Sequence, residues 1–517
     1  MKKVLFLLLF AHQVNAQSTK PASLQPPQQS DSLSIVNRQL APGEMKKDLQ
    51  LFLDIRKKAN SGLYRYRSVK QIDSIYQWAF NQVRQPMSTT DFFKVIVQLT
   101  DFEGSCHNYT EPGGDLVKYF NRQRSFFPFA LKYVEGNIIF NSKTPQIPVG
   151  ARIVSINGVA DKALMSSFYK YLTADGYTTT QKWSNSVNTS YGIRYLYEYG
   201  LKDSYTIRFI APGATEPQTV TIPAVSLEER KANLALRYSA PVDSLIDYNV
   251  QPKYSFKMAN PATGLLNLRI FTMADDANDP AFPVYVKFID SVFQVLSTNN
   301  IPNLILDIRG NPGGSDPTFE QPMMYLTDAS FKENTLAYTI FGNGIPYEKY
   351  FWGVSTSERM DSAAKVAGKA MLQDYFPVFR NGRNIQDSKH NPVYLPKQPR
   401  FKGKLYLLID ENVASAASHL ASLVKAYANN VTIVGVETVG GYYYHNGHMG
   451  LIYELPYSKI KTKFSIVHVE QDAPLKPDQP EGRGIIPHHT VWTSFNDFMQ
   501  QRDTQMEYVH KLIGGQF

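Results

Sequence analysis

Two stretches of sequence decide the fold: Leu304-Ile305-Leu306-Asp307-Ile308-Arg309-Gly310-Asn311-Pro312-Gly313-Gly314, and YLLIDENVASAASHLASL from Tyr406 to Leu423. Each begins as an apolar strand and ends in a tight polar turn. The first turn is rich in glycine, so it can bring bare backbone N–H groups close to another group. The second places Ser415 between a strand and a helix, where free N–H groups stabilise negative charge. A nucleophile beside such donors is typical of acyl transfer.

The residues around these stretches predict the fold class. From about residue 254 onward, apolar segments of strand length alternate with segments of helical spacing. We expect strands over 265–271, 304–308, 405–409 and 431–436, and helices over 284–296 and 416–428. Such alternation is typical of a mainly parallel sheet covered by helices, the α/β class.

The first half of the chain has a different texture. Between residues 45 and 99 apolar residues recur at helical spacing, and Ser88-Thr89-Thr90-Asp91 is a good helix start. This pattern predicts a helical N-terminal domain over residues 41–111. Short alternating segments then predict a small β-rich domain over 112–228, in which a strand ends at an Asn157-Gly158 turn.

The first residues predict export. Lys2 and Lys3 precede an apolar run over 4–10, and Val14-Asn15-Ala16 supplies a small-residue cleavage site. We therefore expect a signal peptide over 1–16, a Ser-, Pro- and Gln-rich linker over 17–40, and a periplasmic or extracellular protein. No later run reaches membrane-spanning length, so we expect no membrane anchor after removal of the signal.

Composition excludes several classes of protein. The 517 residues are 43% hydrophobic and 19% charged, as in a globular protein of two or three domains. The net charge of +9 is spread along the chain without a basic arm, which argues against a nucleic-acid partner. The single cysteine, Cys106, excludes an intramolecular disulfide framework and a cysteine-based zinc site.

Taken in order, these motifs resemble those of the C-terminal processing (tail-specific) peptidases and the related tricorn-core peptidases. The matching segments are Asp307 to Gly314, the Ser415 turn, Gly435-Val436-Glu437-Thr438 and Gly482-Arg483-Gly484-Ile485-Ile486-Pro487. Residues 150–159 also resemble a stretch of PDZ domains. The resemblance implies a ClpP/crotonase-like peptidase core over 229–517, a PDZ-like domain over 112–228 and a helical N-terminal part.

The resemblance also implies the nucleophile and the oxyanion site. Ser415 matches the family nucleophile, although a plain helix-capping serine is the alternative. The oxyanion donors would be the N–H of Ala416 and the N–H of Gly313 or Gly314, while Asp307 and Arg309 would hold the loop.

The general base separates two branches of the family. The serine–lysine branch has a lysine where this chain has Gly441 and Tyr442. Lys425 follows Ser415 on the same expected helix, about 15 Å further along, which is too far to take its proton. The tricorn-like branch uses a histidine at the end of the helical part, and His107 matches it. A serine precedes that histidine in the family, but Cys106 does so here.

The acid that would orient His107 is implied to be Glu481, with Glu470 and Asp478 as rivals on spacing. His445 and His448 are rival bases in the aromatic loop 442–448. A zinc site built from histidines remains a weak alternative, because these residues lack helical spacing and a paired acid: His445, His448, His488 and His489.

The expected function is a secreted serine endopeptidase that acts on peptides or proteins through a Ser-His-Glu site and needs no cofactor or metal. A catalytically inactive peptide-binding protein of the same fold is the alternative. A hydratase of the crotonase fold is disfavoured by the signal peptide and by the serine turn.

Overall fold

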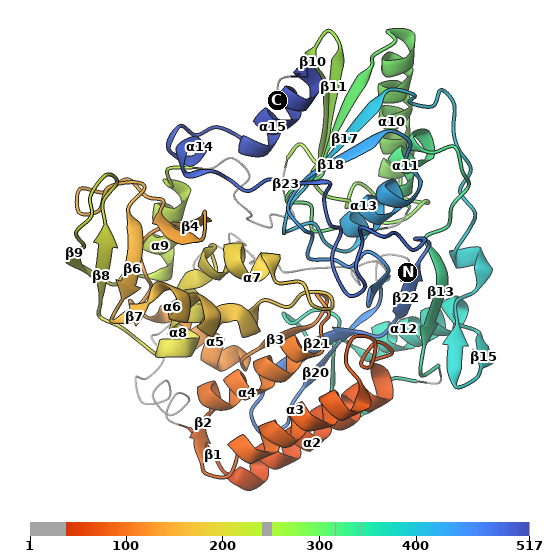
Figure 1. Ribbon diagram of the computed structural model, residues 1–517. Helices are drawn as coiled ribbons and strands as arrows, with labels where there is room; N and C mark the ends of the chain where they lie inside the picture. The colour runs from red at the N-terminus through yellow and green to blue at the C-terminus, as the bar shows by residue number, and fades with distance from the viewer. Residues whose placement is uncertain (1–37, 240–250, 316, 343, 516–517) are drawn as a thin grey trace, which may run out of the picture.

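A six-stranded sheet carries both of the stretches that opened the sequence. The computed structural model describes residues 38–239, 251–315, 317–342 and 344–515. Its central sheet has the strand order β10-β11-β12-β17-β18-β23 (Figure 1). Every neighbouring pair is parallel except β10 and β11, so the predicted mainly parallel sheet is confirmed. The strands are β10 (Tyr254–Asn260), β11 (Thr263–Leu268), β12 (Asn303–Asp307), β17 (Lys404–Ile409), β18 (Val431–Gly435) and β23 (His489–Thr490).

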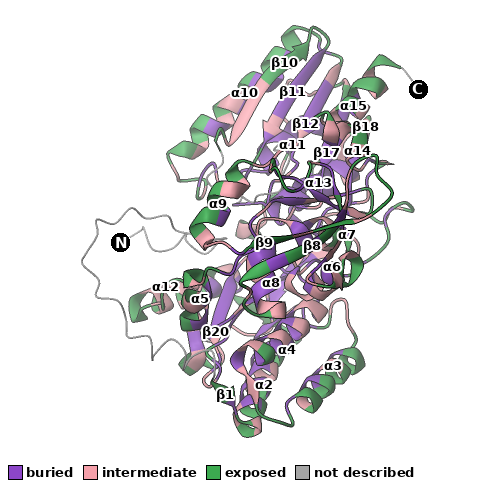
Figure 2. Ribbon diagram, turned by 90° about the vertical axis from the view of Figure 1, so that its left-hand side faces the viewer, coloured by how far each residue is buried: buried purple, intermediate pink, exposed green. Residues whose placement is uncertain are grey.

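Helices cover both faces of this sheet, which explains why the central residues of β12 and β17 are apolar. Along β12, Leu304 and Leu306 pack into the larger core with α10 (Ala281–Thr298), α11 (Glu320–Leu326) and α13 (Ala416–Tyr427). Ile305 faces the opposite way, toward α15 (Thr504–Gly514). Figure 2 shows α13 largely in the colour of buried residues. The short helix α14 (Phe495–Met499) precedes α15.

The N-terminal part is helical, as predicted. It contains α2 (Pro42–Ala59), α3 (Val69–Gln82) and α4 (Thr89–Phe102), and β1 (Gln39–Leu40) pairs with β2 (Met87–Ser88). Ser88 caps α4 by accepting the Asp91 N–H at 3.0 Å, which confirms the predicted helix start. The predicted signal peptide and residues 17–37 of the predicted linker lie outside the described residues.

A separate antiparallel sheet follows, in the order β4-β5-β6-β8-β9, at the left of Figure 1. Asn157 and Gly158 both have positive φ, of 49° and 79°, which is the type I′ turn expected of Asn-Gly. The sheet has its own apolar core. Its strands are β4 (Leu131–Val134), β5 (Asn137–Phe140), β6 (Arg152–Ile156), β7 (Val159–Ala160), β8 (Ser204–Ile210) and β9 (Gln218–Pro223); the helices here are α5 (Gly114–Arg122), α6 (Asp161–Phe168), α7 (Thr180–Ser184), α8 (Tyr191–Tyr199) and α9 (Leu227–Ala235).

Two further sheets were not predicted from the sequence. One has the order β15-β16-β13-β22-β19 and the other β14-β20-β21-β3. In the second, β3 (Tyr109–Glu111) pairs with β21 (Lys461–Ser465), so the segment after α4 is held against the C-terminal half. The remaining elements are β13 (Asn334–Thr339), β14 (Phe351–Gly353), α12 (Ser362–Tyr375), β15 (Val378–Arg380), β16 (Arg383–Ile385), β19 (Tyr444–His445), β20 (Gly450–Glu454) and β22 (His468–Gln471).

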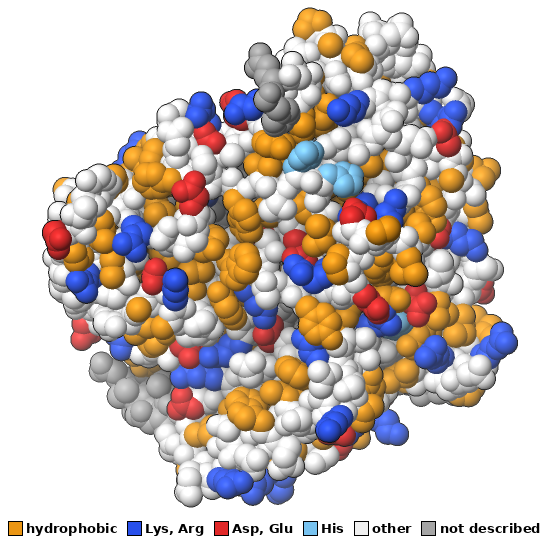
Figure 3. Space-filling model, in the orientation of Figure 1, with side chains coloured by type: hydrophobic (Ala, Val, Ile, Leu, Met, Phe, Trp, Pro, Cys, Tyr) orange, Lys and Arg blue, Asp and Glu red, His pale blue; other side chains and the backbone are white. Residues whose placement is uncertain are grey.

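The surface carries mixed charge. On the face drawn in Figure 3, basic and acidic side chains are interspersed. Among the described residues, no helix is both long and apolar enough to cross a membrane.

Candidate active site

Ser415 occupies a strained turn between β17 and α13. Its φ is 51° and its ψ is −130°, a conformation that a residue with a side chain adopts only at a cost of about 1–3 kcal/mol. Such a strand-to-helix turn is typical of nucleophilic serines, because it exposes the hydroxyl oxygen to a substrate. The side chains on either side, Ala414 and Ala416, are small. The predicted strand–turn–helix setting of Ser415 is confirmed.

The glycine loop after β12 lies directly against this turn. A Cβ atom added to Gly313, whose φ is +102°, would lie 2.6 Å from the Ser415 Cβ and 2.9 Å from the Ala416 nitrogen. Gly314, with φ of +155°, packs even more closely against the backbone of Phe271. Bare backbone is therefore required at both positions.

The hydrogen bonds of the loop decide between the two glycines as oxyanion donors. The Gly313 N–H donates to Oδ1 of Asn311 at 2.8 Å, so it is already engaged. Within the described residues, the N–H groups of Gly314 and Ala416 have no acceptor. These two amides are thus the donors left for an oxyanion.

Asp307 and Arg309 hold the loop, as expected. Arg309 donates from Nη2 to Asp307 at 2.7 Å and from Nη1 to Asp503 at 2.7 Å. Asp503 caps α15 by accepting the Met506 N–H, so this ion pair fastens the loop to the helix across the sheet.

His107 reaches the site from the N-terminal part of the chain. It lies between α4 and β3, and the pairing of β3 with β21 fixes its position. The Nδ1 atom lies 3.5 Å from Sγ of Cys106, and that sulfur also accepts the backbone N–H of Ser415. The thiol thus bridges the imidazole and the turn that carries the serine.

Burial sets the protonation state of His107. The residue is only 4% exposed. Burial, assisted by the positive charge of Lys463 and by His448, lowers the pKa of His107 to about 3. The imidazole is therefore neutral at neutral pH and able to accept a proton.

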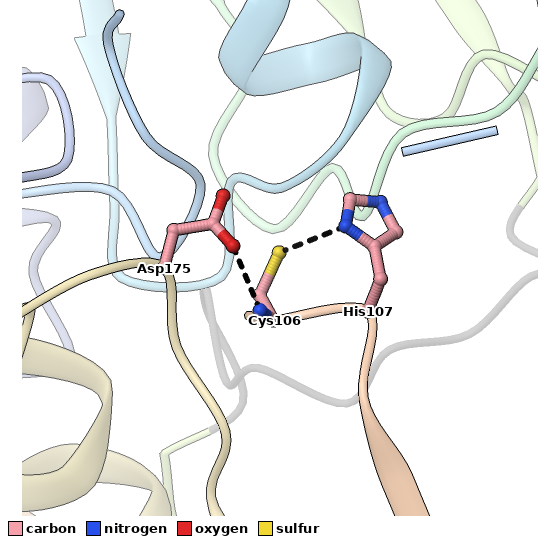
Figure 4. A group of neighbouring side chains, drawn as sticks. All are labelled: Cys106, His107 and Asp175. Carbon is pink, nitrogen blue, oxygen red and sulfur yellow. Dashed lines mark hydrogen bonds between the residues drawn. The ribbon is translucent and has the colours of Figure 1, made fainter. Parts of the chain in front are cut away.

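The carboxylate nearest to this pair is Asp175, which the sequence did not single out. It lies in the segment that precedes α7 and accepts N–H groups from Cys106 at 2.8 Å and from Gly441 at 2.9 Å. Its side chain is buried, and burial raises the pKa of Asp175 to about 6, against the effect of these hydrogen bonds. Figure 4 shows the Cys106 sulfur between the Asp175 carboxylate and the His107 ring.

Glu481, the acid implied by the family resemblance, lies at the surface. The Glu481 side chain is 71% exposed, and its Oε1 lies 2.6 Å from Nη2 of Arg65. Its rivals are also engaged: Glu470 lies 3.5 Å from His468, and Asp478 lies 3.0 Å from Nζ of Lys425. An exposed carboxylate in an ion pair is not the buried orienting acid that the resemblance implied.

The lysines do not restore a serine–lysine site at the predicted positions. Lys425 donates to the Ile486 carbonyl at 2.9 Å and pairs with Asp478, and Tyr442 is fully buried in the core. Lys463, which was not predicted from the sequence, lies close enough to His107 for its positive charge to lower the pKa of that histidine. Burial lowers the pKa of Lys463 to about 8.

The histidines of the suggested zinc set have separate surroundings. The ring of His445 lies 6.0 Å from that of His107 and 5.5 Å from that of His419, centroid to centroid. By contrast, His488 accepts the Ile433 N–H, and His489 lies 3.1 Å from the Tyr508 hydroxyl. The proposed four-histidine set does not converge among the described residues, where only Cys106, His107 and Asp175 come close enough to share an ion.

Comparison with known families matches the part of the chain that carries the serine turn. The model of peptidase family S41 matches residues 266–488, which include the glycine loop and Ser415. Over these residues the chain is similar to peptidase family S41. The S41 family consists of serine peptidases, so the chain is a peptidase of the serine type.

Solved structures extend the likeness beyond the S41 segment. Mature CPAF complexed with lactacystin is 17% identical, with a TM-score of 0.58 over 90% of this chain and 97% of that one. A CPAF mutant is 14% identical, with a TM-score of 0.58 over 91% and 96%. At these identities the likeness concerns the fold alone. No curated protein matches the chain.

Proposed function

We propose that the protein is an exported endopeptidase in which Ser415 attacks the peptide carbonyl and His107 is the general base. The proposal is carried above all by the strained φ of 51° at Ser415, within a segment of an S41 peptidase. Together with a ψ of −130°, this φ strains the backbone, and such strain clusters at active sites, where it presents a catalytic group to the substrate.

The proposed reaction uses groups that lie on both sides of the turn. His107 takes the hydroxyl proton as Ser415 Oγ bonds to the carbonyl carbon, and the N–H groups of Ala416 and Gly314 stabilise the oxyanion. His107 then gives the proton to the leaving amine as the C–N bond breaks. Water hydrolyses the acyl-enzyme by the same steps and frees Ser415.

For the carboxylate that stabilises the imidazolium we propose Asp175 in place of Glu481. Asp175 is buried, has a ligand oxygen within 4.8 Å of a His107 nitrogen, and is held by two backbone N–H groups. A fixed buried carboxylate beside a base favours the cation that forms during proton transfer.

The β-rich domain that contains Asp175 is also proposed to bind substrate, as a PDZ-like module that adds a peptide strand to its sheet. Deleting residues 127–225 is not a clean test of that role, because it would remove Asp175 from the site as well. Peptide binding is better measured directly, by titrating a Ser415→Ala protein with labelled peptides of increasing length. Affinity that does not rise with length would argue against a strand-adding module.

A fluorophosphonate probe tests the nucleophile. Labelling should appear on the wild-type protein, be mapped to Ser415 by peptide mass spectrometry, and disappear in Ser415→Ala together with hydrolysis of casein. Ser418, one helical turn away and buried, provides a matched control: Ser418→Ala removes a hydroxyl that donates to the Ser415 carbonyl and should still be labelled. A correctly folded wild-type protein that is neither labelled nor active would favour the inactive peptide-binding alternative.

A further inference from the structure

Three different metal-ligating side chains converge beside the serine. A ligand atom from each of Cys106, His107 and Asp175 lies within 4.8 Å of the other two. The Cys106 thiol also hydrogen-bonds with the Asp175 carboxylate. The three come from two distant segments, and in Figure 4 their polar ends point toward one another.

The separation of the sulfur and the nitrogen fits one particular kind of ion. Zinc takes a tetrahedral set of ligands at about 2.3 Å for sulfur and about 2.0–2.1 Å for imidazole nitrogen, which places the two ligand atoms about 3.6 Å apart. Sγ of Cys106 and Nδ1 of His107 are 3.5 Å apart. A zinc ion could therefore bind both atoms without moving either residue far.

The charges at the site also suit a divalent cation. A thiolate and the Asp175 carboxylate would offset both positive charges of the ion, in a place where Asp175 is buried without a cationic partner among the described residues. Thiolate and imidazole favour zinc over the hard cations magnesium and calcium.

We propose that Cys106, His107 and Asp175 form an inhibitory zinc site. The ion bonds to the sulfur, to Nδ1 of His107 and to a carboxylate oxygen, with water in the fourth position, and the thiol proton leaves to solvent. Inhibition follows because the imidazole that should accept the Ser415 proton is held by the metal. This inhibition rests on the proposed function, whereas the binding does not.

From a single cysteine alone we expect no cysteine-based zinc site, because such sites usually combine several cysteines. The structure supplies the other ligands from a neighbouring histidine and from a remote aspartate. The same single cysteine makes the test specific, since a thiolate–metal signal can come only from Cys106.

Cobalt(II) binding to the full chain is the direct test. Reduced wild-type protein should give the near-ultraviolet thiolate-to-cobalt charge-transfer band and the visible bands of tetrahedral cobalt, with one equivalent bound and displaced by zinc. Cys106→Ala should lose the charge-transfer band and weaken zinc binding by more than the roughly 10–100-fold that loss of an outer-shell partner costs. Asp175→Asn should weaken binding but keep the band.

Two control variants separate this site from others. Ser415→Ala should bind cobalt as the wild type does, although it is inactive. His390→Gln removes a surface histidine that pairs with Asp374, a plausible place for adventitious metal, and should leave the spectrum unchanged. In the active enzyme, one equivalent of zinc should abolish hydrolysis, a chelator should restore it, and magnesium should have no effect.

The outcomes distinguish the two proposals. A cobalt band in a protein that shows no Ser415-dependent hydrolysis would keep the metal site and remove the proposed function. An active enzyme that shows no thiolate band and is unaffected by stoichiometric zinc would refute the metal site alone. A band that survives in Cys106→Ala, or that disappears in His390→Gln, would also refute it.

Discussion

Replacing Gly313 by alanine should disable the peptidase by pushing the glycine loop away from the serine. The new Cβ would lie 2.6 Å from the Ser415 Cβ and 2.9 Å from both the Ala416 nitrogen and the Ala414 carbonyl oxygen. Carbon atoms in contact prefer about 3.5–4.0 Å, so one side must yield by about 1 Å. The turn that must yield carries both the nucleophile and one proposed oxyanion donor.

The expected magnitude follows from that displacement. A misplacement of about 1 Å can cost about 10²-fold in rate, and loss of an oxyanion donor costs about 10²–10³-fold. We expect kcat to fall by about 10²–10³-fold with a smaller change in KM. The free energy of unfolding should fall by about 1–3 kcal/mol from overpacking, with a further cost because alanine is strained at a φ of +102°.

Gly310 in the same loop provides the matched control. Its φ is +73°, but a Cβ added there would meet nothing within 4 Å. Gly310→Ala should therefore lose about 1–2 kcal/mol of stability through backbone strain while keeping its kcat. Steady-state kinetics on a fluorogenic peptide and urea unfolding of both variants measure the difference. Equal losses of kcat in the two variants, or a wild-type kcat in Gly313→Ala, would refute the proposed contact between loop and nucleophile.

Four other variants or conditions test the site. Ser415→Gly should be inactive yet more stable than Ser415→Ala by up to about 1–3 kcal/mol in urea unfolding, because glycine relieves the strain. Since the pKa of Asp175 is about 6, kcat/KM should rise as the carboxyl loses its proton near that pH, and Asp175→Asn should lack this rise. Glu481→Gln should keep its kcat, and a loss of tenfold or more would return Glu481 to the site. His107 and His419 both have a pKa of about 3 when folded and about 6.5 when unfolded, so only the unfolded chain binds their protons between these pH values. Lowering the pH from 7 to 5 should therefore cost about 2 kcal/mol of folding stability for each histidine. A urea midpoint that does not change with pH would contradict their burial as neutral groups.

The central sheet could be predicted because its strands and the turns that end them are marked by neighbouring residues in the sequence. Strands β12 and β17 are buried on both faces, so every residue from Leu304 to Leu306 is apolar whichever side it packs on. Sharp turns then mark where strands end, and Gly313 and Ser415 stand at two of those ends. Such information lies within a few residues and can be read without knowing the partners.

The features that could not be predicted from the sequence depend on contacts between remote segments. The pairing of β3 with β21 joins residues near 110 with residues near 462, and both strands are short, so neither has a strong pattern of its own. Asp175 carries no motif, and only the approach of its loop to Cys106 and Gly441 gives it a place in the site. Glu481 matched a spacing, but Arg65, which binds it at the surface, belongs to another part of the chain.

The site is therefore assembled from three parts of the chain that fold around separate cores. The part around the central sheet presents Ser415 and the glycine loop, the segment after α4 presents Cys106 and His107, and the β-rich domain presents Asp175. The Ser415 N–H meets the Cys106 sulfur, and the Asp175 carboxylate accepts N–H groups from both Cys106 and Gly441. Because each part contacts the other two, a shift of the β-rich domain would change the surroundings of His107 as well as any peptide-binding surface. The proposed function therefore implies that substrate binding to that domain and proton transfer at Ser415 would be coupled through Asp175.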